Sequence, residues 1–206
     1  MSLSRFTLVG MSLSVFACGG KTDAPATGNS GNTGSNGTPS APATLDPAVV
    51  AAVEAKLPES LKGKVTFEAV EGEKGRHLAV QPKGWEQGVI PGRVKPPAGG
   101  PDLGFMTAFS TGSNCDGSCE AKDWAAVSDK VEFSQFTGGD WQVEKDEKLP
   151  DGRILVAKKA DRVDIALARW KTGASRYFSC RATLDKPLME AAAAFEEACR
   201  QMKIVE

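Results

Sequence analysis

The chain has 206 residues, of which 41% are hydrophobic and 25% are charged, and its 25 Lys and Arg residues balance 26 Asp and Glu residues. This length has room for one globular domain of ordinary size. The even charge balance argues against a strongly basic protein that binds nucleic acid. A single histidine argues against a histidine-rich metal enzyme, and the lack of any run of about 18 apolar residues argues against a polytopic membrane protein.

The N-terminus has the layout of a secretory signal. Arg5 precedes an 11-residue apolar stretch, residues 6–16, which measures about 16 Å as a helix and is too short to span a hydrocarbon core of about 30 Å. Val15-Phe16-Ala17-Cys18 resembles the lipobox of bacterial lipoproteins. The resemblance implies a signal peptide over residues 1–17, cleavage before Cys18 and a lipid on that cysteine. The alternative is a soluble exported protein in which Cys18 has no special role.

A low-complexity segment follows. Residues 21–44 contain only Thr, Gly, Ala, Ser, Asn and Pro, apart from one Lys and one Asp. Such a composition has no aromatic or branched aliphatic side chain whose burial would offset the entropy lost on folding. We therefore predict a disordered linker over residues 18–45 and a single globular domain over residues 46–206.

The first elements of the domain are a helix and a hairpin. Asp46 followed by Pro47 is typical of a helix start, and the apolar spacing predicts a helix over residues 47–57. Residues 64–70 and 77–81 alternate in the manner of strands, with a glycine-containing turn between them.

The Pro- and Gly-rich residues 86–103 are predicted to form a long irregular loop. Loops of this length in compact domains are usually functional or disordered. We take this loop as a contact surface, with Trp85, Ile90 and Arg93 as the candidate contact residues. The predicted partner is an unknown envelope protein or a small ligand, not a nucleic acid.

The middle of the domain is predicted to hold a strand, a helix and a second strand. The strands cover residues 105–111 and 141–145, and Ser118 is the predicted cap of the helix between them. The apolar residues of this helix that are expected to face inward are Trp124, Val127 and Val131.

The last part is predicted to be an antiparallel meander of residues 153–159, 163–170 and 176–183, followed by a helix that starts near Asp185 and Pro187. In total we expect three helices and about six or seven mostly antiparallel strands, which is an α+β fold with helices packed on a sheet.

Four further cysteines form an even set in a chain that is predicted to be exported, which favours disulfides. Strand alternation and helical spacing place Cys180 and Cys199 on core-facing sides of their elements, so we predict one disulfide between them. The second pair is then Cys115 with Cys119. The alternative for the second pair is a redox or zinc role, but its C-x3-C spacing differs from the C-x-x-C of oxidoreductases.

Pro82-Lys83-Gly84-Trp85 after a strand, then an irregular loop, a helix, a meander and a C-terminal helix, is similar to the PsbP-like α/β/α sandwich. The resemblance implies that fold and a non-catalytic accessory role, and it transfers no binding residue.

The sequence indicates no catalytic residue, cofactor or metal site. His77 is expected to be a polar residue at a strand end and not a general base. The meander is locally basic, but its acidic neighbours Asp161 and Asp164 favour a solvated sheet face over a phosphate site. The basic residues concerned are Lys158, Lys159, Arg162, Arg169, Arg176 and Arg181.

These patterns lead to two functional hypotheses. The first is a lipid-anchored, non-catalytic accessory or binding domain of the bacterial cell envelope, held outside the cytoplasm at the periplasm or cell surface. The second is an envelope enzyme, either a thiol oxidoreductase that uses Cys115 and Cys119 or a hydrolase.

Overall fold

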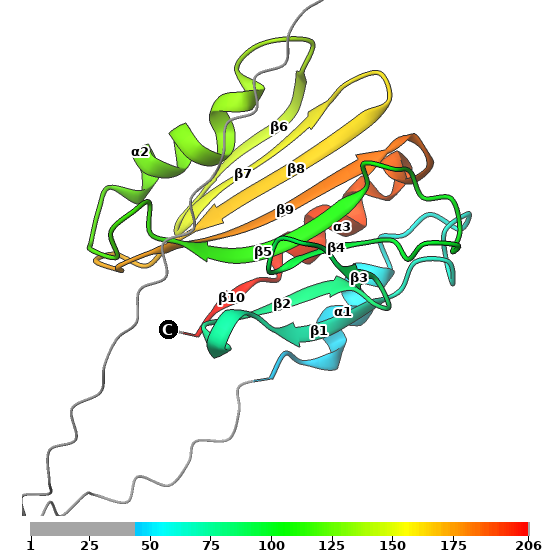
Figure 1. Ribbon diagram of the computed structural model, residues 1–206, viewed down its shortest axis with the longest axis horizontal. Helices are drawn as coiled ribbons and strands as arrows, with labels where there is room; N and C mark the ends of the chain where they lie inside the picture. The colour runs from blue at the N-terminus through cyan, green and yellow to red at the C-terminus, as the bar shows by residue number, and fades with distance from the viewer. Residues whose placement is uncertain (1–43, 206) are drawn as a thin grey trace, which may run out of the picture. The chain divides into compact units, whose positions relative to one another are not determined.

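Two antiparallel β-sheets and their flanking helices form the domain (Figure 1). The computed structural model describes residues 44–205. The predicted signal peptide, Cys18 and all but the last two residues of the predicted linker lie outside the described residues. Leu45 is buried in the core, so the ordered domain begins one residue before the predicted boundary.

The larger sheet has seven strands in the order β3-β4-β5-β9-β8-β7-β6. In that order the strands are Glu86–Gln87, Arg93–Lys95, Ala108–Asn114, Tyr177–Asp185, Arg162–Arg169, Gly152–Lys158 and Gln142–Leu149. The smaller sheet has the order β1-β2-β10, with strands Phe67–Glu71, His77–Pro82 and Lys203–Ile204. All the strand pairs are antiparallel.

Helices lie on both faces of the larger sheet. On its inner face is α3 (Ala192–Arg200), which a 3₁₀ turn, Lys186–Ala191, precedes, and α1 (Pro47–Glu54) packs against α3 and β1. The outer face carries α2 (Trp124–Ser128) and the π and 3₁₀ turns that continue it, Asp129–Phe133 and Ser134–Phe136. Among residues 44–205, none of these helices has the length and apolar character needed to cross a bilayer.

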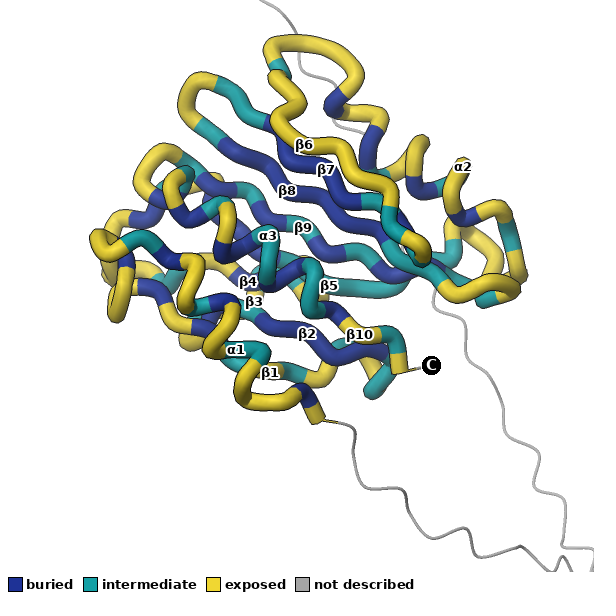
Figure 2. Tube along the Cα trace, turned by 180° about the vertical axis from the view of Figure 1, so that it is seen from behind, coloured by how far each residue is buried: buried dark blue, intermediate teal, exposed yellow. Residues whose placement is uncertain are grey.

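The larger sheet therefore has a core on each face. The inner core lies between this sheet, the smaller sheet, α1 and α3, and Phe195 of α3 is fully buried there. Strands β7 and β8 are buried on both faces, and Figure 2 shows them next to the exposed edge strand β6. Their branched side chains fill the inner core, whereas the outer core takes mainly small residues from them. The outer core consists of Trp124, Phe133, Phe136, Leu155, Ala157, Ala166, Ala168 and Tyr177.

The α+β class, the meander and the helix start at Asp46 are confirmed. The Asp46 carboxylate accepts a hydrogen bond of 2.8 Å from the Ala48 N–H, as expected of a capping residue. The final helix is shorter than predicted, because its first part is a 3₁₀ turn. The two-residue strand β10 and the division into two sheets were not predicted.

The predicted strand 105–111 is wrong at its start. Phe105 is 98% exposed, and β5 begins at Ala108. The preceding residues are held in a turn, since carboxylate oxygens of Asp102 and Asp185 accept hydrogen bonds from the N–H groups of Gly104 and Met106. Local turn chemistry therefore delays the strand.

The predicted start and inward face of the middle helix are also wrong in part. Asp123, not Ser118, caps α2, with its carboxylate 3.2 Å from the Ala126 N–H. Trp124 is buried, but Val131 is 42% exposed because the chain leaves α-helical geometry at Asp129. The π turn instead directs Phe133 into the outer core.

The predicted irregular loop 86–103 contains the short strands β3 and β4. β4 extends the larger sheet beyond β5, with Val94 in the inner core and Arg93 on the outer face. Strand β6 continues to Leu149, past the predicted end at residue 145. Its exposed charged residues suit an edge strand, because charge discourages pairing with another chain.

Candidate functional site

A polar hollow lies on the outer face of the larger sheet, beside the part that α2 and its turns cover. Its volume is about 280 Å³. We call it the arginine hollow. Its lining residues are Arg93, Met106, Ala108, Ser110, Gln135, Arg162, Asp164, Arg181 and Thr183.

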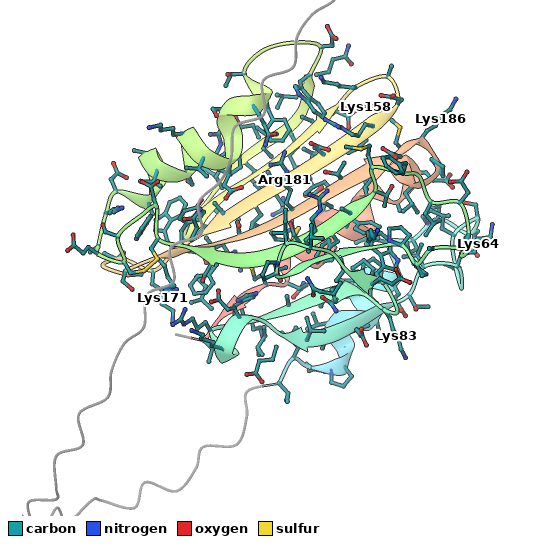
Figure 3. All side chains as sticks on the ribbon, viewed as in Figure 1. Lys64, Lys83, Lys158, Lys171, Arg181 and Lys186 are labelled. Carbon is teal, nitrogen blue, oxygen red and sulfur yellow. A yellow bond between two sulfur atoms is a disulfide. The ribbon has the colours of Figure 1, made fainter. Side chains whose placement is uncertain are left out.

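Strand register brings residues of four strands together in this hollow. Arg93, Ser110 and Arg181 stand opposite one another across β4, β5 and β9. One row further along, Thr183 pairs with Asp164 of β8. Side chains two residues apart on a strand share a face, so Arg162 lies on the same face as Asp164. Figure 3 labels Arg181 over the middle of the larger sheet.

Asp164 is the centre of the charged cluster. It is only 2% exposed, and its two carboxylate oxygens face different arginines. Oδ1 lies 3.3 Å from Nε of Arg162, and Oδ2 lies 3.4 Å from Nη2 of Arg181. The Arg181 contact is a charge-assisted hydrogen bond and the Arg162 contact is an ion pair, so the carboxylate keeps both guanidinium groups on the outer face while their outer parts stay accessible to solvent.

Aromatic rings also position these cations. The guanidinium carbon of Arg162 lies 4.8 Å from the ring centroid of Trp141, and that of Arg181 lies 5.7 Å from Phe136. Lys159 approaches Trp141 as well, at 4.5 Å. Such contacts favour a cation over the ring face and limit the freedom of its side chain.

The hollow carries a net positive charge, because three arginines line it with one carboxylate. Ser110, Thr183 and Gln135 add hydroxyl and amide donors around it. This arrangement is complementary to a small anion.

The expected solvated sheet face is only half right around Arg162 and Arg181, because its two acidic residues differ in burial. Asp164 lies buried beneath them, and only Asp161 is the exposed acidic neighbour that was expected. Lys158 and Arg169 belong to other ion pairs, with Glu144 and Asp151.

The candidate contact residues Trp85, Ile90 and Arg93 do not form one surface. Trp85 packs against the inner core, with its ring centroid 5.8 Å from that of Phe195. Ile90 is 54% exposed beside the fully exposed Val89. Arg93 alone belongs to the arginine hollow.

The structure joins the cysteines in the two predicted pairs. Cys180 and Cys199 are both buried and link β9 to α3, with their Cα atoms 5.4 Å apart. Cys115 and Cys119 close a short loop, with Cα atoms 4.7 Å apart, and Cys119 is exposed. A nitrogen of Arg176 lies 3.8 Å from the Cys119 sulfur.

His77 begins β2, as predicted, but its ring is fully buried. Neither ring nitrogen has a hydrogen-bond partner within the described part of the chain. Gly72 packs directly on the ring, since a Cβ atom there would lie 2.0 Å from it. Burial lowers the pKa of His77, and the nearby negative charge of Glu73 opposes this effect in part.

This burial predicts a pH-dependent stability. The folded state disfavours the imidazolium ion, so the unfolded state binds more protons as the pH falls below about 6.5. We expect the free energy of unfolding to decrease between pH 7.5 and 5.5 and His77→Phe to reduce this decrease. Urea unfolding of both proteins at several pH values measures the free energy of unfolding. Because the chain has one histidine, an equal decrease in both proteins would contradict the assignment.

A larger cleft of about 700 Å³ lies between the β1–β2 hairpin and the β4–β5 side of the larger sheet. Its charged lining residues are Glu71 and Glu73, so it is unsuited to an anion. Within residues 44–205, no group of three or more His, Cys, Asp or Glu residues is placed to hold a metal ion.

Comparisons with known proteins add little to this geometry. No family model and no curated protein matches the chain. Among solved structures, the Ran-binding protein Mog1p of Saccharomyces cerevisiae is similar, with 12% identity and a TM-score of 0.46. The match covers 69% of this chain and 97% of that one. At this level of likeness, no function or residue role is transferred. The fold and the hollow define an α+β domain with a cationic surface site.

Proposed function

We propose that the chain is a lipid-anchored, non-catalytic binding domain of the bacterial cell envelope. The observation that carries the proposal is the lipobox-like Val15-Phe16-Ala17-Cys18, followed by a segment without aromatic or branched aliphatic side chains. In this arrangement the lipid on Cys18 anchors the chain in a membrane. A flexible tether of the predicted linker's length has an r.m.s. span of about 30 Å, enough to hold a domain off the surface.

The two disulfides support this location. Disulfides form and persist in exported proteins and are rare in the reducing cytosol. The C-x3-C loop at Cys115 differs from redox motifs, so we assign both bridges a structural role and favour a binding domain over a thiol oxidoreductase.

Substitution of Cys18 tests the anchor. We expect Cys18→Ser to move the protein from the membrane fraction to the soluble fraction or to leave it uncleaved, because the acylation site is lost. Fractionation and intact mass measure both results. For the wild-type protein, the mass should correspond to residues 18–206 with added acyl groups and two disulfides.

The double variant Cys115→Ser/Cys119→Ser is the matched control, since it removes cysteines without touching the lipobox. It should stay in the membrane fraction. An unmodified wild-type mass that still includes residues 1–17, or a Cys18→Ser protein of wild-type behaviour, would contradict the anchor.

A further inference from the structure

We propose that the arginine hollow binds a phosphate dianion, either free or as a phosphate monoester. The inference concerns the hollow itself and does not depend on the lipid anchor. It starts from the charge: Arg93, Arg162 and Arg181 line the hollow, and Asp164 neutralises one of them. Among the residues that line the hollow, two positive charges remain in excess, which matches a phosphate monoester near pH 7.

The donors suit the shape of this ligand. Phosphate oxygens accept several hydrogen bonds, and guanidinium groups donate two parallel bonds to them. In the hollow, arginines from β4, β8 and β9 surround the same space, with the hydroxyls of Ser110 and Thr183 between them. A carboxylate ligand has fewer acceptor oxygens and would leave more of these donors unused.

The hollow is also preorganised. Asp164 holds Arg162 and Arg181 from below, and Trp141 and Phe136 flank them. Arg93 differs, because its side chain makes no hydrogen bond or ion pair among residues 44–205 that would compete with a ligand. Side chains ordered before binding lose less entropy when the anion arrives.

The ligand has two chemical sources, a soluble phosphate monoester or the headgroup of a lipid such as phosphatidic acid. Met106 lines the hollow and is 48% exposed, and its neighbour Phe105 is 98% exposed. An exposed methionine at a cationic hollow, followed in the chain by an exposed phenylalanine, suits a lipid surface, whereas the recessed Asp164–arginine cluster suits either source. The experiment therefore has an arm for each.

In the soluble arm, inorganic phosphate and glycerol 3-phosphate are titrated into the purified full-length protein by calorimetry. We expect binding at pH 7.5 that weakens at pH 5, where these ligands lose their second negative charge. Arg93→Gln and Arg181→Gln should each weaken binding about tenfold or more. Arg93→Gln is the cleaner variant, since it leaves both ion pairs of Asp164 in place.

In the lipid arm, the full-length Cys18→Ser protein is mixed with phosphatidylcholine vesicles with and without phosphatidic acid. Binding that requires phosphatidic acid and falls with Arg93→Gln and Phe105→Ser identifies a headgroup site. Binding in the soluble arm alone identifies a free monoester.

Arg200→Gln is the matched control in both arms. It removes the same charge, but Arg200 lies on α3 and pairs with Glu147 and Glu196, away from the hollow. Absence of binding in both arms would overturn the proposal. So would equal effects of Arg93→Gln and Arg200→Gln, since net charge alone would then explain the binding. Membrane fractionation of Cys18→Ser tests the anchor separately.

Discussion

Replacing Phe195 by Ala is expected to lower the free energy of unfolding by about 3 to 5 kcal/mol, the usual effect of removing a buried phenylalanine. Phe195 is fully buried where α3 meets both sheets. Its ring centroid lies 5.3 Å from Phe67 of β1 and 6.1 Å from Phe109 of β5. Its loss would leave a cavity between the two sheets that neither can easily fill.

The melting temperature should fall by about 10 °C, given about 2 to 4 °C per kcal/mol in a domain of this size. Phe105→Ala is the matched control. It removes the same side chain from a position that is 98% exposed, so its effect should stay within about 0.5 kcal/mol. Urea unfolding and thermal melts of the two variants compare the sites directly. Similar losses in both would show that Phe195 is not a central core residue.

The inner core could be predicted because periodicity reports which way side chains face. Strand alternation placed Cys180 inward, and Cys180 is buried in the inner core together with Phe178 and Leu184 on the same face of β9. Helical spacing placed Cys199 inward, and it is also buried there. These patterns were sufficient to predict the disulfide between β9 and α3, because both elements cover the same core.

Elements without a strong apolar period were predicted less well. Strand β4 has three residues, and only Val94 contributes to the core, so the glycines and prolines around it indicated a loop. At residues 102–106, the hydrogen bonds of Asp102 and Asp185 to the backbone compete with strand formation. The partner Asp185 lies about 80 residues away, and no local pattern reveals such a contact.

The arginine hollow was missed for a related reason. Alternation shows that Arg181 faces away from the inner core, and the predicted meander places β8 beside β9, but neither shows that β5 and β4 lie on the other side of β9. Strand order places Ser110 and Arg93 on one side of Arg181 and the β8 pair Arg162 and Asp164 on the other. Both Asp161 and Asp164 were expected to be solvated, although Asp161 is exposed and Asp164 is buried beneath two arginines.

The outer face of the larger sheet thus has two chemically different parts. Small residues such as Ala166 and Ala168 leave space for Trp124 and the turns that follow it. Next to this apolar part lies the arginine hollow, where the sheet carries charged and hydroxyl side chains instead. Burial of the apolar part stabilises the strands, and this keeps the register that aligns the arginines.

Removing the disulfide between Cys180 and Cys199 is the second change for which we expect a large loss of stability. The bridge closes a loop with a sequence separation of 19 residues, which corresponds to about 3 kcal/mol in the chain-entropy model. Both sulfurs are also buried, so Cys180→Ala/Cys199→Ala leaves unfilled space between β9 and α3. We therefore expect the free energy of unfolding to fall by about 3 to 5 kcal/mol, the upper part of the range usual for the loss of a native disulfide.

The matched control is Cys115→Ala/Cys119→Ala, which opens a loop with a sequence separation of 4 residues. The same model assigns this bridge about 2 kcal/mol, and exposure of Cys119 means that little packing is lost. Urea unfolding of the oxidised proteins compares the two. Under native conditions with mild reductant, alkylation should modify Cys115 and Cys119 first, because the buried pair becomes accessible only when α3 separates from the sheet. Equal losses in the two double variants, or early alkylation of Cys199, would mean that α3 is not firmly packed on β9 and that the bridge between them contributes little.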